Sequence, residues 1–167
     1  MTAGPRASNV CGMPTLLDLL RHGEAVPVGT VGDRARPLTP EGTRKLLALA
    51  ARLSASEAPP DRAFTSPLLR ASQTAKLVLS VWRASLEIET LEALEPDAVP
   101  ERLIAELDAL NVTGRHVLLV GHLPLLDRLC ARLTGSPAGF AAGSLHRIEF
   151  DGPVRPRDGR SLWHLDP

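Results

Sequence analysis

Cysteine is scarce in this 167-residue chain, which contains only Cys11 and Cys130. Two cysteines cannot build the dense disulfide framework of a small secreted domain, and no Cys-x-x-Cys pair is present to bind zinc. Neither cysteine is followed by an arginine six positions later, which excludes the phosphate-binding loop of cysteine-dependent phosphatases. A reducing, cytoplasmic location is therefore expected.

An excess of charge and long apolar runs are lacking as well. The 19 Lys and Arg residues balance 19 Asp and Glu residues, so no surplus positive charge is available to bind a nucleic-acid backbone or an anionic membrane. The longest apolar run, Leu46–Ala51, is far shorter than the roughly 18 residues of a membrane-spanning helix. The sequence predicts a protein that has neither nucleic acid nor a membrane as its partner.

Three common site motifs are absent. No GxxxxGK[ST] loop is present for nucleoside triphosphates, no GxGxxG for dinucleotides, and no HExxH for zinc. The sequence thus gives no sign of a metal or another cofactor.

Aromatic residues make up only 3% of the chain and tyrosine is absent, whereas 44% of the residues are hydrophobic. The core is therefore expected to be aliphatic. The length suits one domain. Residues 1–13 contain Gly, Pro, Ser and Asn without periodicity, so we expect a disordered leader there and a single domain over residues 14–167.

Short apolar segments alternate with helical patterns along the chain. Buried strands are expected at 15–20, 63–65, 86–88 and 116–120, and helices at 40–56, 67–81, 100–110 and 124–133. A cap residue precedes a proline at Thr39-Pro40 and at Ser66-Pro67, which is typical of helix starts. Two further strands, 144–150 and 160–165, are expected to form a C-terminal hairpin. This alternation predicts an α/β three-layer sandwich, with a mostly parallel central sheet flanked by helices.

Polar side chains follow three of the expected strands. Arg21 and His22 follow the first strand, Ser66 and Arg70 the second, and His122 follows the strand that ends at residue 120. The carboxyl ends of parallel strands meet at one edge of a sheet, where ligands bind. Two guanidinium groups can bind a tetrahedral oxyanion, and histidines can act as nucleophile or hydrogen-bond donor. Phosphate is therefore the expected ligand.

Four segments in this order resemble the histidine phosphatase superfamily, also called phosphoglycerate mutase-like. They are Leu20–Glu24 (LRHGE), Leu38–Gly42 (LTPEG), Ser66–Ala75 (SPLLRASQTA) and Val120–His122 (VGH). The resemblance covers about residues 14 to 150. It implies a phosphoglycerate mutase-like fold and a phosphatase that forms a covalent phosphohistidine without a metal or another cofactor.

The resemblance also implies roles for individual residues. His22 would be the nucleophile, Arg21 and Arg70 would bind the phosphoryl oxygens, and His122 would donate a further hydrogen bond. An imidazole must be neutral to attack, and nearby arginines disfavour its protonation while they neutralise charge on the phosphoryl group. Ser66 is expected to cap a helix and, secondarily, to contact phosphate.

The family commonly supplies a carboxylic acid that protonates the leaving group, from the segment that corresponds to residues 91–96. Glu92 is the first candidate and Glu95 the second, although Glu92 fits a solvated surface acid equally well. In its length, in Arg36–Thr39 (RPLT) and in His122–Leu125 (HLPL), the chain most resembles the small bacterial phosphohistidine phosphatases of the SixA type. In those proteins the acid does not follow the pattern of the larger members.

The short interval between Glu92 and His122, about 30 residues, leaves room for one helix and no lid. An open pocket is therefore expected, which could admit a phosphorylated side chain of another protein. A phosphoramidate with a protonated ring releases neutral imidazole, whose conjugate acid has a pKa of roughly 6.5, so it needs little help from an acid. The expected function is removal of phosphate from phosphohistidine on a partner protein. The alternatives are a broad phosphomonoesterase of small molecules and a non-catalytic phosphate-recognition module.

Overall fold

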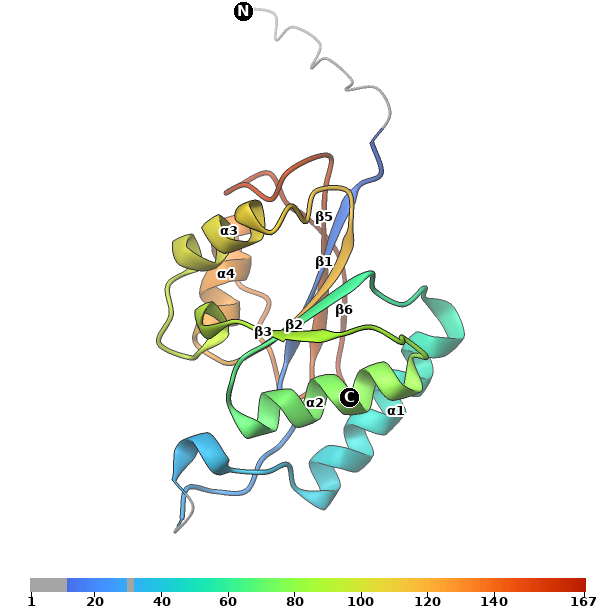
Figure 1. The fold of residues 1–167 in the computed structure, drawn as a ribbon, viewed down its shortest axis with the longest axis vertical. Helices are drawn as coiled ribbons and strands as arrows, with labels where there is room; N and C mark the ends of the chain where they lie inside the picture. Colours follow the sequence, from blue (N-terminus) through green and yellow to red (C-terminus); the bar gives the residue numbers. More distant parts are fainter. Residues whose placement is uncertain (1–11, 30–31) are drawn as a thin grey trace, which may run out of the picture.

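The computed structural model describes residues 12–29 and 32–167, and its centre is a six-stranded sheet with the order β3-β2-β4-β1-β5-β6 (Figure 1). The strands are β1 Thr15–Arg21, β2 Arg62–Thr65, β3 Ile88–Thr90, β4 His116–Gly121, β5 Leu145–Phe150 and β6 Arg160–Leu165. Strands β1, β2, β3 and β4 pair in parallel, whereas β5 runs antiparallel to β1 and β6 antiparallel to β5. The predicted mostly parallel sheet with a terminal hairpin is confirmed.

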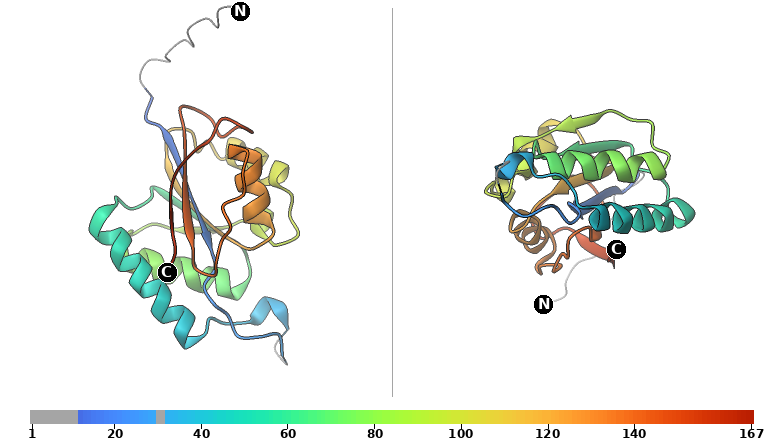
Figure 2. Two further views of the ribbon diagram at one scale, coloured as in Figure 1. Left: turned by 180° about the vertical axis from the view of Figure 1, so that it is seen from behind. Right: turned by 90° about the horizontal axis from the view of Figure 1, so that it is seen from below.

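Helices cover both faces of this sheet (Figures 1 and 2). They are α1 Pro40–Ser56, α2 Leu69–Val81, α3 Pro100–Ala109 and α4 Leu125–Thr134, together with the short 3-10 helices η1 Asp33–Ala35 and η2 Glu92–Leu94. One aliphatic core packs α1 and α2 against the sheet, and a second core packs α3 and α4 against the other face. Leu19 of β1 belongs to the second core and Leu20 to the first, because successive strand residues face opposite sides. The predicted three-layer α/β fold is confirmed.

Several element ends lie where the sequence placed them. The Thr39 hydroxyl accepts a hydrogen bond from the Gly42 amide at 2.9 Å, and α1 begins at Pro40. Helix α4 ends before Gly135, whose φ of 99° is the left-handed conformation that glycine adopts without strain. A Cβ atom on Gly42 would lie 2.4 Å from the Glu24 carbonyl oxygen, so this close approach of α1 to the chain after β1 requires glycine.

Two elements begin two residues later than predicted, whereas the bounds of the other predicted elements agree to within one residue. Helix α2 begins at Leu69 rather than at Pro67, and its N-cap residue, Leu68, makes no side-chain cap bond. The Ser66 hydroxyl lies against His122 instead of capping a helix that starts at the next residue. Strand β3 is Ile88–Thr90 rather than 86–88, because pairing with β2 sets its register. Both shifts come from contacts with distant residues.

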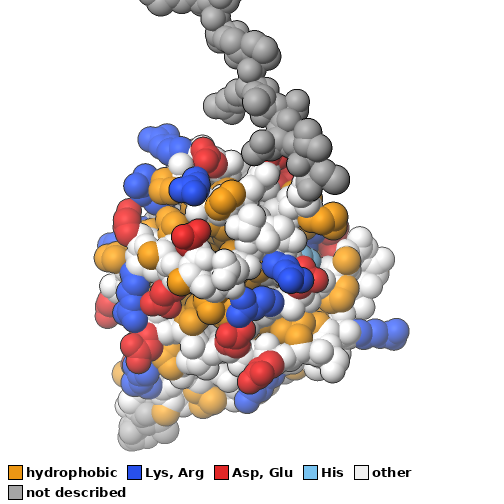
Figure 3. All heavy atoms as spheres, turned by 45° about the horizontal axis from the view of Figure 1, so that its top comes forward, with side chains coloured by type: hydrophobic (Ala, Val, Ile, Leu, Met, Phe, Trp, Pro, Cys, Tyr) orange, Lys and Arg blue, Asp and Glu red, His pale blue; other side chains and the backbone are white. Residues whose placement is uncertain are grey.

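The expected leader over residues 1–13 lies mostly outside the described residues, and its described part, Gly12 and Met13, is exposed ahead of β1. Within the described ranges, no helix has the length and apolarity that crossing a membrane requires. On the face drawn in Figure 3, basic and acidic side chains are interspersed rather than separated into large patches. This mixing agrees with the balanced charge of the chain.

A buried ion network ties β1 to β5. Asp18, in the middle of β1, is fully buried, and Arg147 of β5 donates to its two carboxylate oxygens at 2.7 and 2.8 Å. A third bond from Arg147 reaches Glu57, and His116 Nε2 lies 2.7 Å from Asp18. Burial raises the pKa of Asp18, but the bonds from Arg147 and His116 outweigh it and leave that pKa below its usual value. The network is thus charged at neutral pH.

We predict that Arg147→Met destabilises the fold by about 3–5 kcal/mol at pH 7, because it leaves the buried Asp18 carboxylate without its cation. Urea unfolding measures this loss. The folded-state pKa of Asp18 lies below its unfolded value, so the network stabilises the fold above about pH 4 and the loss shrinks as the pH falls further. The double variant Asp18→Leu/Arg147→Met removes both charges and should recover most of the loss. A single-variant loss below about 1 kcal/mol, the range of surface ion pairs, would contradict this assignment.

Candidate active site

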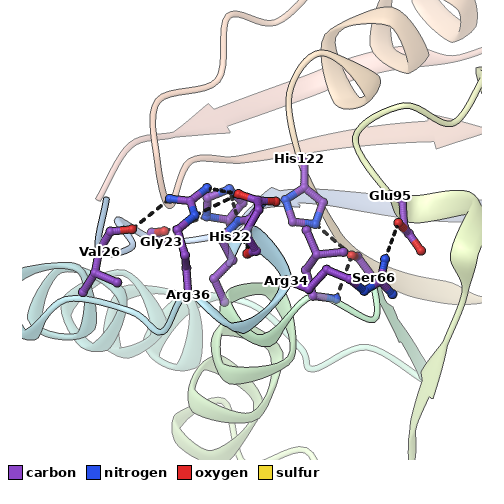
Figure 4. Close-up of polar contacts among 11 residues, drawn as sticks. His22, Gly23, Val26, Arg34, Arg36, Ser66, Glu95 and His122 are labelled. Carbon is purple, nitrogen blue, oxygen red and sulfur yellow. Dashed lines mark hydrogen bonds and ion pairs between the residues drawn. The ribbon is translucent and has the colours of Figure 1, made fainter. Parts of the chain in front are cut away.

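The carboxyl ends of β1, β2 and β4 meet at one edge of the sheet, beside a cavity of about 350 Å³. Arg21 ends β1, His22 follows it, and His122 follows β4. Arg70 reaches the same place from the first turn of α2 (Figure 4 shows the polar contacts). The cavity is lined by Arg21, His22, Glu24, Ala25, Arg36, Arg70, Pro96, His122, Leu123 and Ala142. The two arginines and two histidines expected from the sequence therefore lie together.

Hydrogen bonds fix both the position and the tautomer of His22. Its amide donates to the Gly121 carbonyl at 3.0 Å, and its carbonyl accepts from the Gly143 amide at 3.1 Å. The ring Nδ1 lies 2.7 Å from the Gly23 carbonyl oxygen. Because a carbonyl oxygen only accepts, Nδ1 carries the proton and Nε2 keeps its lone pair. The Arg70 Nε–H donates to this Nε2 at 3.3 Å.

Both cavity histidines are neutral at physiological pH. Burial, and then the positive charges of Arg70 and Arg21, lower the pKa of His22 to about 4, although the bond to Gly23 acts in the opposite direction. Burial, and then the neighbouring His22 and Arg70, lower the pKa of His122 to about 3. The two rings are tilted against each other with 4.8 Å between their centroids. A neutral Nε2 beside guanidinium groups is suited to attack an anionic phosphoryl group.

The Asp33 carboxylate lies between two cavity arginines. Arg70, which is only 3% exposed, donates through Nη1 to the Asp33 carbonyl at 2.8 Å and through Nη2 to Oδ2 at 3.2 Å. Arg36 contacts Oδ1 through Nε at 2.9 Å and through Nη2 at 2.7 Å. The bonds from Arg36, and then from Arg70, hold the pKa of Asp33 below its usual value. An anion of the chain itself therefore occupies donors that could bind phosphate.

Asp33 and Arg36 were not recognised as site residues from the sequence. Both belong to the stretch between Val26 and Leu38, whose prolines and glycines mark it only as a loop. The signal that could have found them is the pair of arginines in Asp33–Arg36 (DRAR), one of which begins the RPLT segment. That segment carries the family resemblance, but its sequence alone does not show that its arginine lines the site.

Two buried polar atoms at the cavity have no hydrogen-bond partner among the described residues: Arg21 Nε and His122 Nδ1. The Nη1 group of Arg21 is bound to the Phe140 carbonyl at 2.9 Å, so the orientation of the guanidinium is fixed while Nε remains available. Buried polar atoms are rarely left unpaired, and unpaired ones need an explanation. A bound oxyanion at this position would supply acceptors for N–H groups of both residues.

Ser66 lies behind His122 rather than on the cavity wall. Its side chain is completely buried, and its Oγ is 2.8 Å from His122 Nε2. The Leu68 amide donates to the same Oγ at 3.2 Å. The expected contact with phosphate would require Ser66 to line the cavity, and Ser66 is not among the lining residues.

The structure also does not bring the candidate acids to the cavity. The Glu92 side chain is 75% exposed, and its Oε2 is 3.6 Å from Arg102. Glu95 pairs with Arg34 at 2.9 Å (Figure 4). Neither residue lines the cavity, whose own carboxylate is that of Glu24. The role of Glu92 as proton donor stays a prediction that this geometry does not support.

Within the described residues, no group of three or more His, Cys, Asp or Glu side chains could hold a metal ion. Ser144 bonds through its hydroxyl to Asp166. Its carbonyl accepts from the Arg21 amide at 3.0 Å, so it supports the strand end through its backbone. Cys130 is buried in the core between α4 and the sheet.

Comparison with known proteins gives the same family as the site residues. The model of the histidine phosphatase superfamily (branch 1) matches residues 17–98. A phosphohistidine phosphatase SixA homolog from Haemophilus influenzae is 31% identical over 144 residues, which cover 80% of this chain and 87% of that protein. This chain belongs to the histidine phosphatase superfamily.

Solved structures agree with this membership in the superfamily. The protein histidine phosphatase SixA, complexed with tungstate, is 29% identical, with a TM-score of 0.82 over 91% of this chain and 97% of that one. Phosphoglycerate mutase from Bacillus anthracis is 19% identical, with a TM-score of 0.71 over 90% of this chain and 93% of that one. The second likeness shows the fold alone. The expected phosphoglycerate mutase-like fold and the resemblance to SixA are confirmed.

We predict that neither cavity histidine becomes protonated between about pH 8 and 5. The lowered pKa values place the midpoints near 4 for His22 and near 3 for His122, because their buried rings face arginines. Ring ¹⁵N chemical shifts of histidine-labelled protein, assigned with His22→Ala and His122→Ala, measure both midpoints. A midpoint near the ordinary value of about 6.5 for either ring would contradict the prediction.

Proposed function

We propose that this protein is a phosphatase that transfers a phosphoryl group from its substrate to His22 Nε2 and then to water. The observation that carries the proposal is the His22 ring itself. Its Nδ1 proton is bound to the Gly23 carbonyl, so Nε2 carries no proton and its lone pair accepts a hydrogen bond from Arg70 Nε, 3.3 Å away, in the resting protein. Arg21, Arg70 and His122 would bind the phosphoryl oxygens, through the unpartnered Arg21 Nε and His122 Nδ1 among other donors.

The proposed reaction has two steps. In the first, His22 Nε2 forms a bond to phosphorus, and the bond to the leaving group breaks with its electron pair going to that group. In the second, water attacks phosphorus and the bond to Nε2 breaks with its electron pair returning to Nε2. Phosphate leaves with the oxygen and one proton of that water, and the other proton goes to the solvent. The arginines neutralise charge on the phosphoryl oxygens in both steps, which is the main contribution a protein makes to such a transfer. These steps use only side chains of the chain and water.

The substrate we propose is phosphohistidine on a partner protein. The names of two relatives, a phosphohistidine phosphatase SixA homolog and the protein histidine phosphatase SixA, support it. The position of the candidate acids Glu92 and Glu95 away from the cavity wall, where Glu24 is the one carboxylate among the described lining residues, agrees with it as well, because a protonated phosphoramidate releases a neutral imidazole with little help from an acid. A cytoplasmic location, expected from the low cysteine content, stays part of this proposal.

We predict that His22→Ala abolishes phosphate release, because no nucleophile remains. Arg70→Ala should lower kcat by on the order of 10³-fold, the lower range for an arginine that neutralises charge in phosphoryl transfer. Phosphate release and acid-labile labelling of the protein measure the two effects. Arg115→Ala is the matched control and should keep full activity. Arg115 is exposed and precedes the amino end of β4, whereas the site lies at the carboxyl end. Near-normal turnover by either site variant would overturn the mechanism.

The substrate class is tested by comparing a phosphohistidine-bearing protein with a panel of phosphomonoesters, using chelator-treated enzyme. Preference for phosphohistidine, lost in His22→Ala, is the expected result. Preference for small phosphomonoesters would keep the mechanism and refute the proposed substrate. Binding of phosphate without release from any compound would make the protein a recognition module.

We predict that Asp33→Asn strengthens binding of inorganic phosphate by about two- to fivefold, the scale of a partly exposed ion pair. The reason is that the carboxylate competes with phosphate for Arg70 and Arg36. Calorimetric titration with phosphate measures the change, and Asp108→Asn on the exposed side of α3 is the charge-matched control. Weaker phosphate binding by Asp33→Asn would show instead that Asp33 orients the two arginines.

A further inference from the structure

We propose that Ser66 is a positioning residue that sets the tautomer of His122: its hydroxyl donates to His122 Nε2 and thereby places the ring proton on Nδ1. The Nδ1–H is then the group that His122 offers to a bound phosphoryl oxygen. The role of this proton in catalysis rests on the proposed function, whereas the tautomer itself is a property of the resting protein.

A backbone hydrogen bond between the two strands holds the side chains of Ser66 and His122 next to each other. Ser66 follows β2, and its amide donates to the carbonyl of Val120 in β4 at 3.1 Å, two residues before His122. The serine is fully buried and the histidine 1% exposed. Their 2.8 Å contact is drawn in Figure 4. The contact is direct, and the hydroxyl lies at Nε2 of the ring and not at Nδ1.

Counting protons decides the direction of this hydrogen bond. The Ser66 Oγ already accepts from the Leu68 amide and has one hydrogen to donate. If that hydrogen goes to His122 Nε2, the hydroxyl and Nε2 are both satisfied, and the Nδ1–H is the one group left without a partner in the described residues. If Nε2–H donates instead, two buried groups are left without partners there, the hydroxyl hydrogen and the lone pair on Nδ1. Each unpaired buried polar group is costly, so the first arrangement is favoured.

The ring nitrogen that does not contact the serine, Nδ1, is the one that remains for a ligand of the cavity. His122 lines the cavity, and its Nδ1 is one of two buried atoms there without a partner in the described part of the chain. A neutral imidazole has one N–H donor and one acceptor. Unprotonated phosphoryl oxygens are acceptors, so the Nδ1–H tautomer is the one that can donate to them. The charged groups that act on this ring are those of Arg70, Arg21 and Asp33, together with His22, and burial keeps the ring neutral among them.

The contact that Ser66 makes with the backbone leaves its proton available. Helix α2 begins at Leu69, and the Ser66 hydroxyl oxygen accepts from the Leu68 amide just before it. Accepting this bond does not use the hydroxyl hydrogen, which can therefore be donated to His122.

The test compares Ser66→Ala with Ser66→Thr, which keeps the hydroxyl. Ring ¹⁵N spectra of the resting protein should show His122 protonated on Nδ1 in the wild type and in Ser66→Thr, and a changed tautomer population in Ser66→Ala. Loss of one donor to an anion should weaken binding of inorganic phosphate about 10- to 100-fold in Ser66→Ala. Thr65→Val is the matched control, because it removes a buried hydroxyl from the preceding residue, one that donates to the Ser66 carbonyl and not to His122. It should change neither result.

A second measurement separates positioning from structural support. If Ser66 acts through His122, removing it from a His122→Ala background should cost no further phosphate affinity, whereas independent effects would add. Protonation of His122 on Nε2 in the wild type would overturn the proposal even if Ser66→Ala did not fold. Additive losses would overturn it as well. Failure of the proposed phosphatase function would instead appear as turnover that survives His22→Ala. The ring spectra and the phosphate-binding measurements do not depend on turnover.

Discussion

The parallel register of β2, β4 and β1 is the constraint on which the site depends. Arg21 pairs with Gly121, and Thr65 pairs with Val120, so the three strands end at nearly the same level of the sheet. The residues that follow leave the sheet at one edge and bring His22 and His122 to a ring separation of 4.8 Å. A slip of one residue would turn each side chain to the opposite face of the sheet. Register in turn follows from the aliphatic cores on both faces, because a slip would also exchange their members.

At this edge of the sheet, the neutral state of the two histidines is linked to the arginines that surround them. Burial and the nearby guanidinium groups keep both rings uncharged, which a nucleophile requires. The same guanidinium groups repel one another when no anion is bound. Asp33 offsets this by placing its carboxylate between Arg36 and Arg70. Because Asp33 lies in η1 and is half exposed, its contact can be exchanged for phosphate more readily than the buried pairing of Asp18 with Arg147.

Local sequence patterns predicted what local physics determines. The strands that precede His22 and His122 and the cap at Thr39 follow from apolar runs and backbone conformation, and they were predicted to within one residue. The late start of α2 was missed because the Ser66 hydroxyl has a distant competing partner. The pairing of Asp18 with Arg147 joins residues 129 positions apart, which no local pattern shows. The direction of Glu92 was equally unpredictable, since composition near a strand end does not fix where a side chain points.

The two histidines illustrate how backbone and side-chain partners assign opposite tasks to identical rings. His22 is bound at Nδ1 by a carbonyl oxygen, which can only accept, so its other nitrogen presents a lone pair. In the proposed arrangement His122 is bound at Nε2 by a hydroxyl that donates, so its other nitrogen presents a proton. Neither assignment needs a charged ring. A site built this way can attack a phosphoryl group and bind its oxygens over a broad range of pH, because partners fixed by the fold hold each proton in place.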